Sequence, residues 1–158
     1  ALEEVLLRIE RSPLGAHRMV GSGEAPSIQV DVAESTARQH VARICNYIGQ
    51  NFREEICAAD IAEAADLHPK YAMNIFKKST GMTLNSYITL LRLSYAQAML
   101  MTAGVNVLDI AMDSGFGSLS AFNKSFSKLA GKSPTDFRRD SNARGAPIGV
   151  RERIANRA

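Results

Sequence analysis

Residues 60–87, DIAEAADLHPKYAMNIFKKSTGMTLNSY, recur in altered form as residues 109–137, DIAMDSGFGSLSAFNKSFSKLAGKSPTDF. The second copy carries one extra residue just after Phe116, so matched positions lie 49 residues apart before it and 50 apart after it. Phe76 therefore matches Phe126, and Gly81 matches Gly131. Two copies fall short of the three or more that a solenoid needs to bury a continuous core. The sequence therefore predicts two similar units that face one partner.

Each copy is predicted to fold as a short helix, a sharp turn and a second helix, which is the helix-turn-helix pattern. Asp66 and its counterpart Gly115 suit the turn, because glycine takes a positive φ freely and aspartate tolerates it better than most residues. The second helix begins at Pro69 in one copy and after the good N-cap Ser118 in the other, and each ends at a glycine. The expected helices are 36–52, 59–65, 69–80, 83–102, 107–114, 119–130 and a last one that begins at Ser133.

Residues 83–102 are long enough to join the two copies as a single helix. Its apolar side is predicted to comprise Leu84, Tyr87, Ile88, Leu91, Tyr95, Ala98 and Met99. At about 1.5 Å per residue such a helix spans about 30 Å. Successive major grooves on one side of a duplex are about 34 to 36 Å apart. The linker is therefore predicted to place two reading helices one turn of DNA apart.

The remaining sequence divides the chain by charge and by composition. Residues 1–11 have helical apolar spacing, and Gly and Pro residues then mark a loop as far as Pro26. Residues 1–35 have a net charge of −3, whereas 36–140 and 141–158 each have +3. We expect an all-α fold: a short N-terminal helical segment with a linker (1–35), a seven-helix duplicated domain (36–140) and a basic tail (141–158). The basic excess fits a surface that meets a polyanion, with a solvated face as the alternative.

Composition excludes several other classes of protein. Charged residues interrupt every apolar run well short of the roughly 18 residues of a membrane-spanning helix, and the first residues are unlike a signal peptide, so a cytoplasmic location is expected. Cys45 and Cys57 have no metal-ligand spacing and are predicted to be reduced, mostly buried small residues. The sequence has no phosphate-binding glycine loop, no metal cluster and no nucleophile with an identifiable base. No enzyme activity, cofactor or metal is therefore expected.

The second helix of each copy divides into an apolar back and a polar front. In residues 69–80 the predicted buried positions are Ala72, Ile75, Phe76 and Ser79, and the outward ones are Lys70, Met73, Asn74, Lys77 and Lys78. In residues 119–130 the buried positions are Phe122, Ser125, Phe126 and Leu129, and the outward ones are Ser120, Asn123, Lys124, Ser127 and Lys128. A helix that reads DNA needs this division, with cations near phosphates and short polar side chains near base edges.

Individual side chains suggest particular contacts. Asn74 and Asn123 could each pair with N6 and N7 of adenine, and Lys124 could reach a guanine or a phosphate. Tyr71 and Met73 could contact thymine methyl groups or sugar, while Tyr71 could equally pack beside the first helix of its unit. Solvated helix faces are the alternative, and the repetition of the pattern with a matched linker favours DNA.

The second copy resembles the signature of the AraC/XylS transcriptional regulators. The shared features are an Ile-Ala pair, a Gly-Phe turn, an aromatic-rich recognition helix, and Gly-x-Ser-Pro before a final aromatic residue and Arg. Together with the first copy, the resemblance covers about Thr36 to Asp140. It implies seven helices in two helix-turn-helix units that insert recognition helices into successive major grooves of promoter DNA. Asn74 stands where the family often has Arg, and Ala72 where a larger apolar residue is usual.

The resemblance also implies site residues and partners. Lys70, Met73 and Asn74 fall where the first recognition helix reads bases, and Leu119, Ser120, Asn123 and Lys124 fall at the matching places in the second. The full set expected to contact DNA is Lys70, Met73, Asn74, Lys77, Lys78, Ser118, Leu119, Ser120, Asn123, Lys124 and Lys128. The implied partners are double-stranded promoter DNA, RNA polymerase, and a second copy of the protein bound through an N-terminal sensing domain, of which residues 1–35 would be a remnant. The alternative function is a helical protein-interaction module that keeps the fold without binding DNA.

Overall fold

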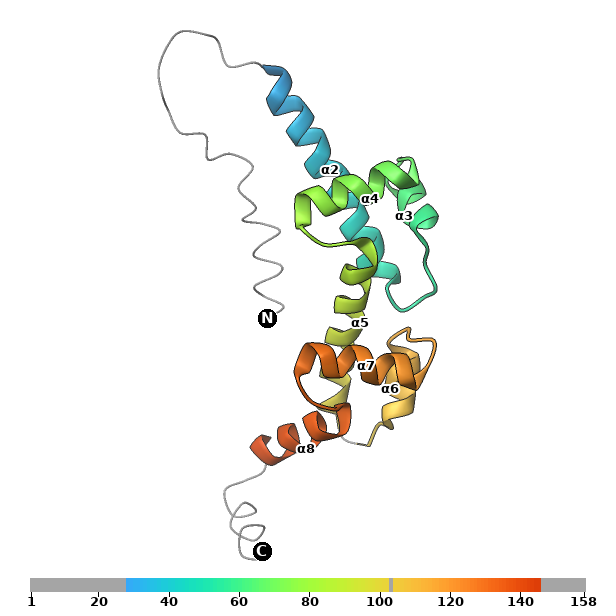
Figure 1. Ribbon diagram of the computed structural model, residues 1–158, viewed down its shortest axis with the longest axis vertical. Helices are drawn as coiled ribbons and strands as arrows, with labels where there is room; N and C mark the ends of the chain where they lie inside the picture. The colour runs from blue at the N-terminus through green and yellow to red at the C-terminus, as the bar shows by residue number, and fades with distance from the viewer. Residues whose placement is uncertain (1–27, 103, 146–158) are drawn as a thin grey trace, which may run out of the picture. The chain divides into compact units, whose positions relative to one another are not determined.

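The computed structural model describes residues 28–102 and 104–145, with side chains for 34–102 and 104–143. Within these residues the chain forms seven helices and no strand, so the predicted all-α fold is confirmed (Figure 1). The chain divides into two compact units, one ending at Ile88 and the other beginning at Thr89. No helix of the described part is long and apolar enough to span a membrane. The helix predicted over residues 1–11 lies outside the described residues.

Unit 1 contains α2 (Ile28–Asn51), α3 (Ala58–Ala64), α4 (Pro69–Thr80) and the start of α5 (Leu84–Leu100). Both α3 and α4 pack on α2 (Figure 1). The buried side chains that hold these helices together are Val41, Ile44, Ile48, Ile61, Ala62, Ala65, Ala72, Ile75, Phe76, Leu84, Tyr87 and Ile88. Helix α2 begins eight residues before the predicted Thr36. The reason is that no Gly or Pro interrupts the sequence between Pro26 and Gly49.

Tyr87 closes the core of unit 1 from the first turn of α5. Its ring centroid lies 5.4 Å from that of Phe76, and the side chain is buried. Burial raises the pKa of Tyr87 to about 12, and the negative charge of an ionised Cys45 and a hydrogen bond between the two side chains act in the same direction. Burial also raises the pKa of the Cys45 thiol, against the opposing effect of that hydrogen bond. Both groups are therefore protonated at neutral pH.

Unit 2 repeats this plan with α6 (Val107–Asp113), α7 (Leu119–Ala130), α8 (Pro134–Gly145) and the rest of α5, from Thr89 onward. Its core consists of Leu93, Ala96, Leu100, Ile110, Ala111, Phe116, Phe122 and Phe126. Four rings follow one another through this core, with centroids 5.3 Å apart for Phe116 and Phe122, and 5.5 Å for Phe122 and Phe126. Phe137 of α8 continues the series 5.5 Å from Phe126 and matches the position of Tyr87 in unit 1.

The turn inside each unit has the same hydrogen bonds. Leu67 N–H donates to the Ala62 carbonyl at 2.8 Å, and Phe116 N–H donates to the Ala111 carbonyl at 3.1 Å. In each turn the backbone N–H one residue earlier donates a second hydrogen bond to the preceding helix. The two bonds together form the Schellman motif, which needs a left-handed residue just past the helix end. Asp66 (φ 57°) and Gly115 (φ 83°) are those residues, as the sequence predicts.

The ends of α4 and α7 also follow the sequence predictions. Gly81 and Gly131 end α4 and α7 in left-handed conformation, with φ of 77° and 71°. At the other end, His68 caps α4, since its Nδ1 accepts a hydrogen bond from the Lys70 N–H at 3.3 Å. Asn106 caps α6 in the same way, accepting from the Leu108 N–H at 3.0 Å.

Cys57 is not buried, which contradicts the prediction for this residue. It is exposed and occupies the N-cap of α3, the position that Asn106 holds in unit 2. Its backbone N–H donates to the Asp60 carboxylate at 2.6 Å. This bond, with a further one from the thiol, holds the pKa of Asp60 below its usual value. An N-cap residue lies at the end of a helix beside solvent. The usual burial of cysteine therefore does not apply to Cys57 at this position. Cys45 is half-buried, which agrees only in part with the prediction that it is mostly buried.

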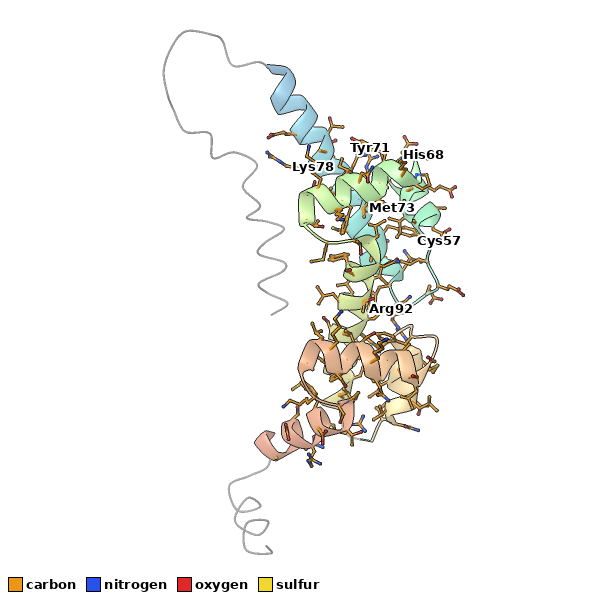
Figure 2. All side chains as sticks on the ribbon, in the orientation of Figure 1. Cys57, His68, Tyr71, Met73, Lys78 and Arg92 are labelled. Atoms are coloured by element: carbon orange, nitrogen blue, oxygen red, sulfur yellow. The ribbon has the colours of Figure 1, made fainter. Side chains whose placement is uncertain are left out.

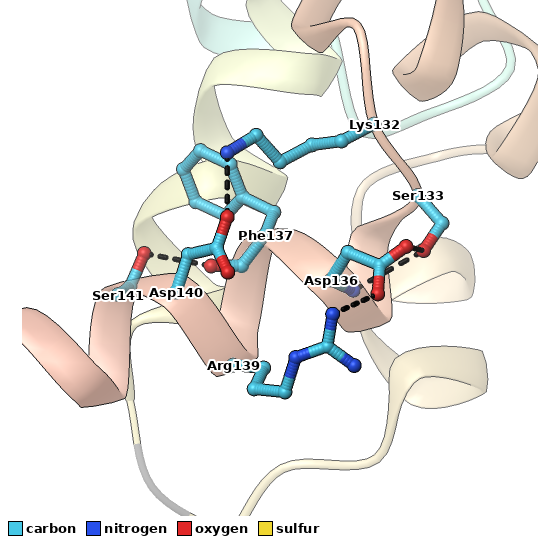
Figure 3. A network of polar contacts seen from close by, with 7 residues as sticks. All are labelled: Lys132, Ser133, Asp136, Phe137, Arg139, Asp140 and Ser141. Carbon is cyan, nitrogen blue, oxygen red and sulfur yellow. Dashed lines mark hydrogen bonds and ion pairs between the residues drawn. The ribbon is translucent and has the colours of Figure 1, made fainter. Parts of the chain in front are cut away.

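Polar contacts fix the start of α8 (Figure 3). The Ser133 hydroxyl accepts from the Asp136 N–H at 3.1 Å and donates to the Asp136 carboxylate at 2.7 Å, while Arg139 donates to the same carboxylate at 2.6 Å. Lys132 forms an ion pair with Asp140 at 2.7 Å. In unit 1, Thr83 accepts from the Ser86 N–H at 3.2 Å to cap α5. The duplication therefore extends into the helices that follow α4 and α7.

Two predictions of helix faces are wrong. Leu129 was expected in the core and is 47% exposed, close to the glycine that ends α7. In α5, Leu84, Tyr87 and Ile88 are buried as predicted, but the second half buries Leu93, Ala96 and Leu100, while Leu91 and Tyr95 are half-buried and Ala98 is exposed. One helix here supplies two separate cores, so a single apolar stripe does not describe it.

Candidate nucleic-acid interface

Helix α4 has a buried and an exposed side. Ala72, Ile75 and Phe76 recur at helical spacing and pack into unit 1, which holds the opposite side toward solvent. All five residues of α4 that the sequence predicts as DNA contacts are exposed: Lys70, Met73, Asn74, Lys77 and Lys78. Pro69 at the first helical position and the His68 cap fix the helix start, and thereby the direction of Lys70.

Helix α7 presents the second set in the same manner. Phe122 and Phe126 are fully buried, and the exposed residues include Ser118, Ser120, Asn123, Lys124, Ser127 and Lys128. The Ser118 hydroxyl accepts the Ala121 N–H at 3.2 Å as the N-cap. Leu119 is half-buried and packs against the core of unit 2. Of the predicted contact residues in unit 2, Leu119 therefore has the least free surface to offer.

Charge is distributed unevenly within each unit. Helices α4 and α7 contain five lysines and no acidic residue, whereas the acidic residues Asp60, Glu63, Asp109 and Asp113 lie on α3 and α6. Among the described residues, none of the five lysines takes part in an ion pair. Their ammonium groups are therefore available to an external anion.

A pocket of about 340 Å³ lies between α2 and α4. Glu34 and Ala37 line it from α2, and the lining from α4 is Tyr71, Asn74, Ile75, Lys78 and Ser79. Figure 2 shows Tyr71 and Lys78 toward one edge of α4 and Met73 toward another. The pocket thus divides the exposed residues of α4: Asn74 and Lys78 border α2, while Lys70, Met73 and Lys77 lie outside it.

The prediction from the sequence missed the part that α2 plays beside α4. Glu34 lies before the predicted helix start at Thr36, yet it lines the pocket and forms an ion pair with Arg38 at 3.3 Å. The absence of Gly and Pro after Pro26 is the signal that would have extended the predicted helix to include Glu34. Tyr71, for which a DNA contact and packing within the unit were both open, lies in this pocket with 51% of its surface exposed.

Comparison with known proteins identifies the family. The family described as a helix-turn-helix domain matches residues 61–140, just over half of the chain. Over 144 residues the chain is 29% identical to the melibiose operon regulatory protein of Escherichia coli (strain K12). This match covers 91% of this chain and 48% of that protein. The chain thus spans about half the length of the relatives it matches.

Solved structures agree with this assignment. The C-terminal domain of AraT, a response regulator from Geobacillus stearothermophilus, is 25% identical with a TM-score of 0.61, covering 64% of this chain and 84% of that one. The DNA-binding domain of AdpA, a global transcriptional factor solved in complex with a target DNA, shares the fold at 24% identity and a TM-score of 0.62, covering 66% and 94%. From its paired helix-turn-helix units, the match over residues 61–140 and these relatives, the chain belongs to the AraC/XylS family of transcription regulators.

Proposed function

We propose that this chain binds double-stranded promoter DNA sequence-specifically and thereby regulates transcription, with α4 and α7 inserted into successive major grooves. The observation that carries the proposal is the pair of acid-free helices at matched places in two copies of one unit, each of which presents lysines on its exposed side. A duplex presents phosphates along both edges of the major groove, so binding there favours a helix that carries cations and few carboxylates. Both α4 and α7 fit this description.

The side chains divide by what they can contact. Lys70, Lys77, Lys78 and Lys128 are assigned to phosphates, because an ammonium group gains most from a full negative charge. Asn74 and Asn123 are assigned to base edges, where amide groups match the donor and acceptor pattern of adenine, and Lys124 is placed to reach either a guanine or a phosphate. Ser118, Ser120 and the exposed part of Leu119 contact the backbone and bases near the N-terminus of α7.

The lengths of the relatives suggest how the chain works in the cell. Since it spans about half of the melibiose operon regulatory protein, we propose that it is the DNA-binding part of a longer cytoplasmic regulator. In the longer regulator to which this chain would belong, an N-terminal sensing domain would mediate dimerisation, and the complex bound to DNA would contact RNA polymerase. The chain itself would act by binding, without enzymatic activity, cofactor or metal.

The proposal is tested by titrating the chain with fluorescent promoter fragments and measuring anisotropy. Fragments are first selected from genomic DNA by binding, so that a common sequence defines the site. Replacing Asn123 with Ala should weaken binding to the selected site by about 1–3 kcal/mol and leave binding to unrelated DNA unchanged. Asn46→Ala, which alters an exposed asparagine on α2, is the matched control and should change neither. Failure to bind any fragment more tightly than unrelated DNA would contradict the proposal and favour a protein-interaction module.

A further inference from the structure

The two recognition helices present different chemistry at the same position of the repeat. Met73 on α4 matches Asn123 on α7, since the copies are offset by 50 residues in this region. Both side chains are exposed, and Met73 has 44% of its surface free. An exposed thioether offers an apolar surface and only a weak acceptor, whereas an exposed amide offers both a donor and an acceptor.

The difference extends along a whole row of each helix. Residues Lys70, Met73 and Lys77 lie at the spacing of one helix face and stand outside the pocket that Asn74 and Lys78 share with α2. The matched residues of α7 are Ser120, Asn123 and Ser127, all exposed. In unit 1 this row therefore consists of an apolar side chain between two cations. In unit 2 it consists of three small polar side chains.

Each row suits a different feature of the major groove. The thymine C5-methyl is the apolar group that a base pair presents there, so a methionine can read sequence only by packing against it. The flanking lysines of unit 1 lie one turn of helix from Met73 on either side, a spacing that allows them to meet phosphates beside that base. An asparagine, by contrast, can pair with adenine through N6 and N7 at the same time.

Resting on the proposed function, we infer that this row of residues reads the two half-sites by different means. Met73 recognises a thymine methyl group, with Lys70 and Lys77 on the neighbouring phosphates, and Asn123 recognises an adenine by paired hydrogen bonds. The two half-sites of the operator therefore differ in chemistry, and the direction in which the protein lies on DNA is fixed by that difference. Met73 is a specificity-determining residue rather than a general contact.

Base analogues in the selected operator test the inference. Deoxyuridine in place of thymidine removes only the C5-methyl, and at the position that Met73 contacts it should weaken wild-type binding about fourfold. Met73→Ala should bind equally well with thymine or uracil there. The control is Met112→Ala, because Met112 lies on α6 with 42% of its surface exposed, close to the exposure of Met73. That variant should keep the fourfold penalty.

The second half-site is tested in the same way with 7-deazaadenine, which lacks the N7 acceptor. It should weaken wild-type binding about tenfold at one adenine of that half-site, and Asn123→Ala should be insensitive to it. Equal uracil penalties in the wild type and Met73→Ala, or no penalty at any thymine of either half-site, would overturn the inference while leaving DNA binding intact. Absence of binding to the unmodified operator at low salt would instead remove the proposed function, and the inference with it.

Discussion

The lysines of the recognition helices should make DNA binding steeply dependent on salt. Each phosphate that a lysine neutralises adds about 0.9 to the slope of log affinity against log salt, because it releases condensed counterions. Lys70, Lys77, Lys78, Lys124 and Lys128 are exposed and make no ion pair within the described residues. If each meets one phosphate, the slope is about −4.5, and affinity falls about 500-fold between 50 and 200 mM salt.

Removing the three lysines of α4 isolates the contribution of unit 1 to the salt dependence of binding. The triple variant Lys70→Gln, Lys77→Gln, Lys78→Gln should reduce the slope to about −1.8, which leaves a decrease of about 12-fold over the same range. Fluorescence anisotropy with the selected operator at four or more salt concentrations gives both slopes. Arg43→Gln, which removes an exposed cation from α2, is the control and should keep the wild-type slope.

A triple variant that keeps the wild-type slope would show that α4 does not lie along phosphates. A wild-type slope near zero would refute the electrostatic reasoning for both helices. Circular dichroism should show unchanged helix content in the variant, since the three side chains lie outside the core. A change in slope is therefore attributable to contacts with DNA and not to unfolding.

Four further substitutions concern stability, and the effect of each is measured by urea unfolding. Gly49→Ala should stabilise the chain by about 1 kcal/mol, because the glycine lies within α2 with open space around the new Cβ; Gly81→Ala should destabilise it by about 1 kcal/mol, because φ there is +77°. Equal effects of the two would contradict the conformational argument. Asp66→Gly should stabilise unit 1 by about 0.5–1 kcal/mol, because Asp66 has a φ of 57° where its counterpart in unit 2 is a glycine. A loss of stability would show that the Asp66 side chain contributes more to stability than its backbone strain costs. The pKa of Tyr87 is about 12 in the folded chain, above the usual 10, so the unfolded chain loses this proton first. Its contribution to stability is therefore complete below about pH 10 and is lost as pH rises toward 12; Tyr87→Phe should flatten this part of the pH profile, and an unchanged profile would count against the assigned pKa.

Features set by neighbouring residues could be predicted from the sequence. Gly81 and Gly131 end helices because a left-handed residue is needed there, and Asp66 and Gly115 occupy their turns for the same reason. The exposure of the recognition lysines was equally predictable. Phe76, Phe122 and Phe126 define the buried side of the helices, and the lysines fall on the other side.

Features set by tertiary packing could not be predicted in this way. A regular apolar repeat placed Leu129 in the core, but α7 ends at Gly131 and leaves that side chain 47% exposed. The single stripe expected along α5 fails because its two halves serve different cores. Glu34 and Tyr71 line the same pocket between α2 and α4 although they are 37 residues apart in the sequence, and no local pattern indicates that they lie near one another.

The central claim is that both units read successive major grooves of one duplex at once. Inserting five base pairs between the half-sites of the selected operator rotates one groove away by about half a turn, since a full turn takes about 10–10.5 base pairs. The affinity, measured by anisotropy, should fall to that of a duplex carrying a single half-site. An affinity equal to that of the natural operator would contradict simultaneous binding by α4 and α7.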